Sequence, residues 1–307
     1  MLNLTRLKVL SEVVNRGSFS AAADALDYTQ SAVSQAIARL EAETGTTLLV
    51  RDRRAIRPTP AGSTLLSHAE AIFAQVQAAE DDLAAMLGVR GGRLRVATFP
   101  SGGATLMPQA VAAFRRAHPA VELTLAEGEP EDIVPRLRAG ELDLALLFGF
   151  IGDEQRFAGL SVTLLFNDPL YAALPVNHML VRKHALTLSD LCNEDWVQTS
   201  AASANARYVV DQCRLAGFAP RVSFESDDYE TVQGLVAAGV GVALIPRLAL
   251  TRVHPGIVVR ALEPVSPVRN VVAATAQNPG VAPAAQSMLE VLRARAPEYA
   301  EGRVGVR

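Results

Sequence analysis

The sequence is poor in cysteine. Only Cys192 and Cys213 occur among its 307 residues, and neither belongs to a CxxC motif. This scarcity excludes a framework of disulfides, and we expect two small, buried or half-buried thiols in a reduced, cytoplasmic chain. A redox switch, or a nucleophilic role for Cys192, is the alternative.

Long hydrophobic runs are also missing. No stretch reaches the length needed to span a bilayer. The N-terminus is apolar in patches, but Arg6, Lys8 and Glu12 interrupt it, so it lacks the continuous apolar core of a signal peptide. The sequence therefore predicts no membrane association.

Catalytic and cofactor motifs are absent as well. There is no Walker motif, no GxSxG and no cluster of metal-ligating residues, and the five histidines are scattered. The segment GVGVALIP at 239–246 lacks the third glycine of a dinucleotide fingerprint and leads into a strand pattern instead of a helix. We expect no metal, no cofactor and no enzymatic activity, because no nucleophile–base pair is visible.

The length of the chain indicates two or three domains. Half of the residues are hydrophobic and a fifth are charged, a globular composition with ample core. The net charge of −3 neither favours nor opposes nucleic acid as a partner, so local charge decides. By pattern, short helices and a basic hairpin occupy 1–62, a long helix and hinge occupy 63–90, and alternating strands and helices fill 91–307.

Two short helical patterns lie three residues apart near the N-terminus, where Ser18 and Thr29 are suitable N-caps. Alanines on the inward face of the earlier one allow close crossing, as a helix-turn-helix requires. Small polar side chains begin the outer face of the later one, where recognition helices contact bases in the major groove. The alternative is a merely solvated face. These polar residues are Gln30, Ser31, Ser34 and Gln35.

A basic hairpin follows directly. The stretch LLVRDRRAIRPTPAG at 48–62 reads as two short apolar strands around a polar turn, with four arginines within seven residues. Beside a recognition helix this arrangement predicts the wing of a winged helix-turn-helix, whose arginines bind phosphates. On its own, an arginine-rich hairpin is more often a solvated surface.

The next segment predicts a long helix. Thr59 and Pro60 form a cap followed by proline at the first helical position. Apolar residues then recur at alternating steps of four and three, the seam of a coiled coil, which favours dimerisation over a helix packed only on its own domain. The seam consists of Leu65, Ala69, Ile72, Val76, Ala79, Leu83 and Met86.

The C-terminal part alternates apolar strands with helices, a pattern typical of parallel α/β architecture. Its length suggests two lobes with a ligand in the crevice between them. We expect lobe I at about 91–165 and 268–300, and lobe II at about 166–267. Two polar turns, Ser101–Gly103 and Thr199–Ser203, each follow a strand and open a helix, which favours a carboxylate or another anion. Ordinary helix caps without a ligand are the alternative.

These parts, in this order, resemble the LysR-type transcriptional regulators. The stretch GSFSAAADALDYTQSAVSQAIARLEAETGTTLLVRDRRAIRPTPAG at 17–62 is similar to the DNA-binding signature of that family. It departs at Ser31, where proline is frequent, and at Leu49, where phenylalanine is usual. The C-terminal part resembles type II periplasmic binding proteins, and LVAAGVGVALIP at 235–246 looks like their second-lobe signature.

The resemblance implies an all-α winged helix-turn-helix, a dimerisation helix and a two-lobed α/β effector domain. It also implies a homotetramer that binds double-stranded promoter DNA and responds to a small, anionic effector. Carried over by motif, the DNA contacts are Thr29, Gln30, Ser31, Ser34 and Gln35, with Arg39, Arg53 and Arg54 on phosphates. The effector contacts are Ser101, Gly102, Phe148, Gly149, Thr199, Ser200 and Ser203.

Two other functions compete with this one. The first is a binding protein that uses only the α/β lobes, which the fused basic hairpin and the missing signal peptide oppose. The second is an enzyme that acts in the cleft, for which the sequence offers no catalytic residues.

Overall fold

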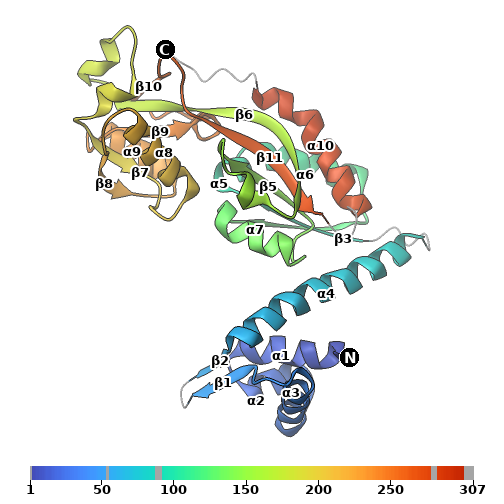
Figure 1. Cartoon of the computed structure of the whole chain (residues 1–307). Helices are drawn as coiled ribbons and strands as arrows, with labels where there is room; N and C mark the ends of the chain where they lie inside the picture. Colours follow the sequence, from blue (N-terminus) through green and yellow to red (C-terminus); the bar gives the residue numbers. More distant parts are fainter. Residues whose placement is uncertain (1, 53–54, 87–91, 278–281, 301–307) are drawn as a thin grey trace. The chain divides into compact units, whose positions relative to one another are not determined.

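In a computed structural model, the chain folds into two compact units (Figure 1). Residues up to 87 belong to the first unit, and residues 88–138 and 142–307 belong to the second. The structure describes residues 2–52, 55–86, 92–277 and 282–300. Within those ranges no helix is long and apolar enough to cross a membrane.

The first unit begins with three helices whose ends the capping residues explain. The Ser18 side chain accepts from the Ala21 amide, and the Thr29 side chain accepts from the Ala32 amide. Gly17 and Gly45 end their helices in the left-handed conformation that glycine adopts without strain. The elements are α1 (Leu4–Arg16), α2 (Phe19–Ala25), α3 (Gln30–Thr44), β1 (Leu49–Asp52), β2 (Ala55–Pro58) and α4 (Pro60–Met86).

One apolar cluster forms the core of this unit. It joins the inward faces of α1, α2 and α3 to Leu48 and Leu49 of the hairpin. Ala22 and Ala23 are buried at the crossing, as the helix-turn-helix pattern requires.

The apolar seam of the long helix α4 is buried at its start and exposed further along. Ala69 is fully buried in the core of its own unit, and Leu65 and Ile72 pack against that core. The N-terminal half of the heptad seam is therefore committed to packing within the unit, which the periodicity alone did not indicate. Further along the seam Val76 and Ala79 are exposed. The side chains of Leu83 and Met86 lie outside the described part of the chain.

The second unit contains a sheet whose strands, among the described residues, run in the order β10-β6-β11-β5-β3-β4, with β9 also paired to β6. In this sheet only β4, β3 and β5 are parallel; β11 and β6 run antiparallel to their neighbours. β7 and β8 form a separate parallel pair. The predicted parallel architecture thus holds for these two groups of strands only. The strands are β3 (Arg93–Thr98), β4 (Glu122–Glu127), β5 (Leu144–Gly149), β6 (Leu160–Pro175), β7 (Asp195–Gln198), β8 (Arg221–Glu225), β9 (Ala243–Pro246), β10 (Ile257–Arg260) and β11 (Val268–Ala276).

Helices cover both faces of this sheet (Figure 1). Alternate residues of β3, β5 and β11 pack on α6 and α10 or on α7, because successive side chains of a strand point to opposite faces. We call lobe I the part formed by β3, β4, β5, β11 and the first half of β6 with these helices, and we call the part built on β7–β10 lobe II. The helices are α5 (Pro100–Gly103), α6 (Leu106–Ala117), α7 (Pro130–Arg138), α8 (Ala204–Leu215), α9 (Tyr229–Ala237) and α10 (Pro283–Ala300), with 3₁₀ turns at Glu154–Phe157, Met179–Arg182, Leu188–Leu191 and Arg247–Leu250.

Candidate nucleic-acid interface and effector pocket

The first turns of α3 present polar side chains to solvent. Its other face is closed, because Val33, Ile37 and Leu40 are fully buried. The Thr29 hydroxyl caps the helix and also lies 3.0 Å from the Ser31 hydroxyl, with which it shares a hydrogen bond. The predicted DNA contacts Thr29, Gln30, Ser31, Gln35 and Arg39 are exposed and Ser34 is half-buried.

The hairpin of β1 and β2 follows this helix in the same unit. Leu49 pairs with Pro58 and Asp52 with Ala55, so the turn lies between Asp52 and Ala55. The predicted phosphate contacts Arg53 and Arg54 lie outside the described residues.

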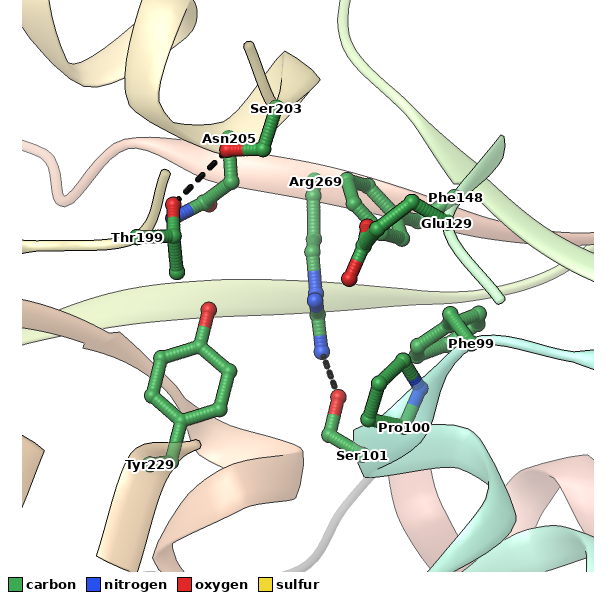
Figure 2. A pocket seen from close by; sticks show the side chains of 10 residues that line it. All are labelled: Phe99, Pro100, Ser101, Glu129, Phe148, Thr199, Ser203, Asn205, Tyr229 and Arg269. Atoms are coloured by element: carbon green, nitrogen blue, oxygen red, sulfur yellow. Dashed lines mark hydrogen bonds between the residues drawn. The ribbon is translucent and has the colours of Figure 1, made fainter. Parts of the chain in front are cut away.

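The second unit contains a small cavity between its two lobes, shown in Figure 2. Lobe I supplies residues that follow β3 and β4 or end β5, and lobe II supplies the turn after β7 and the start of α9. This is the crevice predicted for the ligand. The lining residues are Phe99, Pro100, Ser101, Glu129, Phe148, Thr199, Ser203, Asn205, Tyr229 and Arg269.

Arg269, which lines this cavity, belongs to a buried ion pair. Arg269 and Asp168 are 1% and 0% exposed, and the Arg269 Nε lies 2.8 Å from the Asp168 Oδ2. Arg269 Nη2 donates to the Ser101 hydroxyl at 2.7 Å, and the Leu248 amide donates to the other Asp168 oxygen. Asp168 therefore neutralises the guanidinium and holds it in place, while a donor reaches the cavity.

Aromatic rings support the same guanidinium. Its carbon lies 4.9 Å from the centre of the Phe99 ring and 4.8 Å from that of Phe148. The two rings meet edge to face at 5.1 Å. Contact with the faces of both rings stabilises a cation and restricts the Arg269 side chain to one direction.

Glu129 carries a second carboxyl group into the cavity, where Figure 2 shows it near Arg269. Within the described part of the chain its side chain makes no hydrogen bond or ion pair. Burial, reinforced by the Glu131 carboxylate, raises the pKa of Glu129 to about 7, although Arg269 opposes the shift. Glu129 therefore titrates near neutral pH.

The turn after β7 places hydroxyl groups opposite Arg269. Thr199 Oγ1 and Ser203 Oγ lie 2.8 Å apart and share a hydrogen bond, and Ser203 caps α8. Two backbone amides of this turn already have partners, because the Ser200 amide donates to Asp227 and the Ala201 amide donates to Glu225. Thr199 and Ser203 line the cavity.

Three of the predicted effector contacts do not line the cavity. Both glycines are closely packed. A Cβ added at Gly102 would lie 2.8 Å from the Leu146 side chain, and a Cβ added at Gly149 would lie 2.7 Å from the Phe157 ring. Ser200 holds Asp227 and does not line the cavity. The structure brings together the remaining four, Ser101, Phe148, Thr199 and Ser203.

A second cavity adjoins the first inside lobe II. The two share Thr199, Asn205 and Tyr229, and the rest of its wall is mostly apolar. Two polar atoms in this wall, Gln198 Nε2 and Asn205 Oδ1, are buried without a hydrogen-bond partner in the described structure. Each cavity has a volume of about 10 Å³, close to the space of one water molecule.

Two contacts join the lobes beside the cavity. The Arg207 guanidinium on α8 lies 2.5 Å from the Glu131 carboxylate on α7. The Phe150 ring, which follows β5, stacks on the Tyr208 ring of α8 with centroids 3.7 Å apart. The structure is thus that of a closed cleft.

Neither cysteine belongs to the cavity. Cys192 is exposed elsewhere, and Cys213 is buried in the core, where burial raises the pKa of its thiol to about 12. Such a thiol is a poor nucleophile near neutral pH. Within the described residues no group of His, Cys, Asp and Glu is arranged to hold a metal ion.

Sequence reasoning missed several residues of the cavity. The one available signal was charge inside apolar strands, since Arg269 and Asp168 each interrupt a strand that is otherwise largely apolar. Glu129, Asn205 and Tyr229 lie at or near helix starts and look like ordinary first-turn residues.

Two family models cover most of the chain. The model described as "Bacterial regulatory helix-turn-helix protein, lysR family" matches residues 4–63. The model described as "LysR substrate binding domain" matches residues 88–297.

Characterised and named relatives agree with these models. The chain is 32% identical to the transcriptional dual regulator GltC of Bacillus subtilis, over 84% of this chain and 85% of that protein. It is 33% identical to the probable HTH-type transcriptional regulator LrrA of Synechococcus elongatus, over 97% and 98%.

Solved structures share the fold. Full-length OxyR from Pseudomonas aeruginosa, a variant, matches with a TM-score of 0.72 and 25% identity, covering 96% of this chain and 95% of that one. CbnR in complex with its target DNA matches with a TM-score of 0.66 at 22% identity over 96% and 100%, a likeness of fold alone. By both of its matched domains and its relatives, the chain belongs to the LysR family of DNA-binding transcriptional regulators, which are not enzymes.

Proposed function

We propose that the protein binds promoter DNA sequence-specifically as a symmetric oligomer and responds to a small, anionic effector in the cleft of its second unit. The observation that carries the DNA-binding part is the division of α3 into a buried apolar face and an exposed polar face at its N-terminal turns. Gln30 and Gln35 can each donate and accept at an adenine edge, and Arg39 can reach a phosphate. Arg53 and Arg54 of the wing are proposed as further phosphate contacts.

Oligomerisation is proposed from α4. Its seam continues past the part that packs in the first unit, with Val76 and Ala79 exposed. Two copies joined along this helix would place two α3 helices about a two-fold axis, as an inverted-repeat operator requires. Sedimentation of the full chain tests this part, and a chain that remains a monomer on its selected duplex would overturn it.

Gln30→Ala tests the recognition helix. We expect it to weaken binding to the preferred duplex by about 1–3 kcal/mol and to relax the preference at one base pair, because a bidentate base contact is lost. Preferred duplexes would be selected from a random pool and then titrated by mobility shift at several salt concentrations.

Arg39→Ala is the contrasting variant. Loss of a phosphate contact should weaken binding to all duplexes alike and reduce the salt slope by about one. Asn15→Ala, exposed on α1, serves as the unaffected control. Equal affinity of the wild-type chain for selected and random duplexes would refute sequence-specific binding.

The effector part is tested by a thermal-shift screen of the full chain against small carboxylates, since a ligand that binds only the folded chain raises its stability. Thr199→Val keeps the shape of the side chain but removes a hydroxyl from the cavity. Hits that weaken in this variant support the site. A screen without hits would oppose an anionic effector and leave the DNA-binding result standing.

A further inference from the structure

The effector cavity is not simply cationic. Its one cation among the described residues, Arg269, is already neutralised by Asp168 at 2.8 Å. Glu129 then adds a carboxyl group that has no hydrogen-bond or ion-pair partner in the described chain. A ligand that carries only negative charge would meet Arg269 favourably and ionised Glu129 unfavourably.

The groups around Glu129 also favour a positively charged group of the ligand beside it. The charged and titratable groups that act on it come from α7, β11 and the start of α9. Most of them are acidic, and burial with these neighbours raises the pKa of Glu129 to about 7. They are Glu131 and Asp132, the opposing cation Arg269, Asp227, and the phenol of Tyr229.

The opposite end of the cavity is suited to an anion. Arg269 donates through Nε and Nη2 to Asp168 and Ser101, while Nη1 donates to none of the described residues. The hydroxyls of Thr199, Ser203 and Tyr229 lie around the same space (Figure 2). Charged donors and hydroxyls of this kind recognise a carboxylate.

The adjoining cavity has a different, mostly apolar lining. Val197, Val209, Val232 and Leu244 give it apolar walls. Gln198 and Asn205, 6% and 5% exposed, each carry an unpartnered polar atom there. A small polar group of the ligand at the boundary of the two cavities would satisfy these atoms.

We propose that the anionic group of the effector is the carboxylate of a small amino acid, which also carries an ammonium group, and this inference rests on the proposed function of the cleft. Its carboxylate contacts Arg269 and the hydroxyls, its ammonium group contacts Glu129, and its side chain points toward Tyr229 and the mouth of the second cavity. Because the cleft is closed and the cavities are small, binding requires the Glu131–Arg207 pair and the Phe150–Tyr208 stack to separate first.

The test is isothermal titration of the full chain with the common amino acids. Each is paired with its 2-oxo acid, which lacks the ammonium group, and with its amine, which lacks the carboxylate. We expect at least one amino acid to bind about tenfold or more tightly than either of its partners, because each charged contact is lost in one of them. Glu129→Gln should abolish the advantage over the 2-oxo acid, whereas Glu127→Gln, exposed on β4, should preserve it.

The pH dependence has a definite sign. An ammonium group favours ionised Glu129, so binding releases a proton and affinity rises with pH up to about 7, where the free carboxyl titrates. A simple anion favours neutral Glu129, and its affinity falls over the same range.

Three outcomes would overturn the inference: a 2-oxo acid that binds as tightly as its amino acid, a Glu129→Gln variant with unchanged preference, or no binding by any amino acid. The first two would leave the proposed anionic effector in place. Binding by none of the acids, together with an empty carboxylate screen, would count against the effector itself. Circular dichroism of Glu129→Gln confirms that the variant is folded.

Discussion

Replacing Arg269 with methionine is expected to lower the free energy of unfolding of the second unit by about 3–5 kcal/mol. The substitution would leave the buried Asp168 carboxylate without its ion-pair partner. Asp168 is 0% exposed, and without the guanidinium only the Leu248 amide would remain to stabilise its charge. Trp196, the single tryptophan of the chain, is buried in the second unit, so its fluorescence during urea denaturation reports this unit alone.

A double variant separates the stability lost with the ion pair from the cost of leaving Asp168 buried without its partner. Asp168→Leu combined with Arg269→Met should cost less than Arg269→Met alone, because an apolar pair needs no compensating charge. Arg214→Met is the matched control, since its ion pair with Asp211 is largely exposed and should be worth at most about 1 kcal/mol. Similar losses in Arg214→Met and Arg269→Met would contradict the assigned role.

Gly62→Ala is expected to destabilise the first unit by about 3 kcal/mol, at the upper end of overpacking effects. An added Cβ would lie 2.1 Å from the Leu48 carbonyl oxygen and 3.3 Å from the Pro58 Cβ. The oxygen belongs to the backbone and already accepts from the Thr59 amide, so it cannot turn away as a side chain could. The start of α4 would have to move off the hairpin.

Hydrogen exchange measures this effect locally. Amides of α1 and α3 should exchange faster in Gly62→Ala and DNA binding should fall, while the Trp196 unfolding transition of the second unit stays in place. Gly234→Ala is the control, because nothing lies within 4 Å of its added Cβ and the position is helical. It should be neutral or gain about 0.4–1 kcal/mol. Slow exchange in Gly62→Ala would show that the hairpin junction tolerates a methyl group.

The helices of the first unit could be predicted because their determinants are local. Ser18 and Thr29 cap the helices that follow them, and Gly17 and Gly45 end helices, as their positions in the sequence indicate. The packing of the α4 seam could not be predicted from local sequence. Ala69 faces the core of its own unit because the hairpin turns α4 back onto α1, and a heptad pattern does not reveal which apolar surface it meets.

Four of the ten residues that line the cavity could be predicted from their places at the ends of strands. Ser101, Phe148, Thr199 and Ser203 end strands or follow them, and the ends of strands meet in a crevice. The Arg269–Asp168 pair depends on the register of two strands far apart in sequence, which composition cannot supply. Gly102 and Gly149 follow the same strand-end rule but meet side chains from other elements, so they fill space beside the cavity.

Arg269 and Asp168 are direct cross-strand partners, and Asp168 lies two residues before β6 leaves β11 to pair with β9 in lobe II. The residue that we propose to contact the ligand is therefore anchored close to the point where β6 passes from β11 to β9, between the lobes. Because Arg269 bonds directly to Asp168 on β6, a shift of the guanidinium would act on this strand without intervening side chains. Ligand recognition and the stiffness of the joint should consequently change together in any variant of this pair.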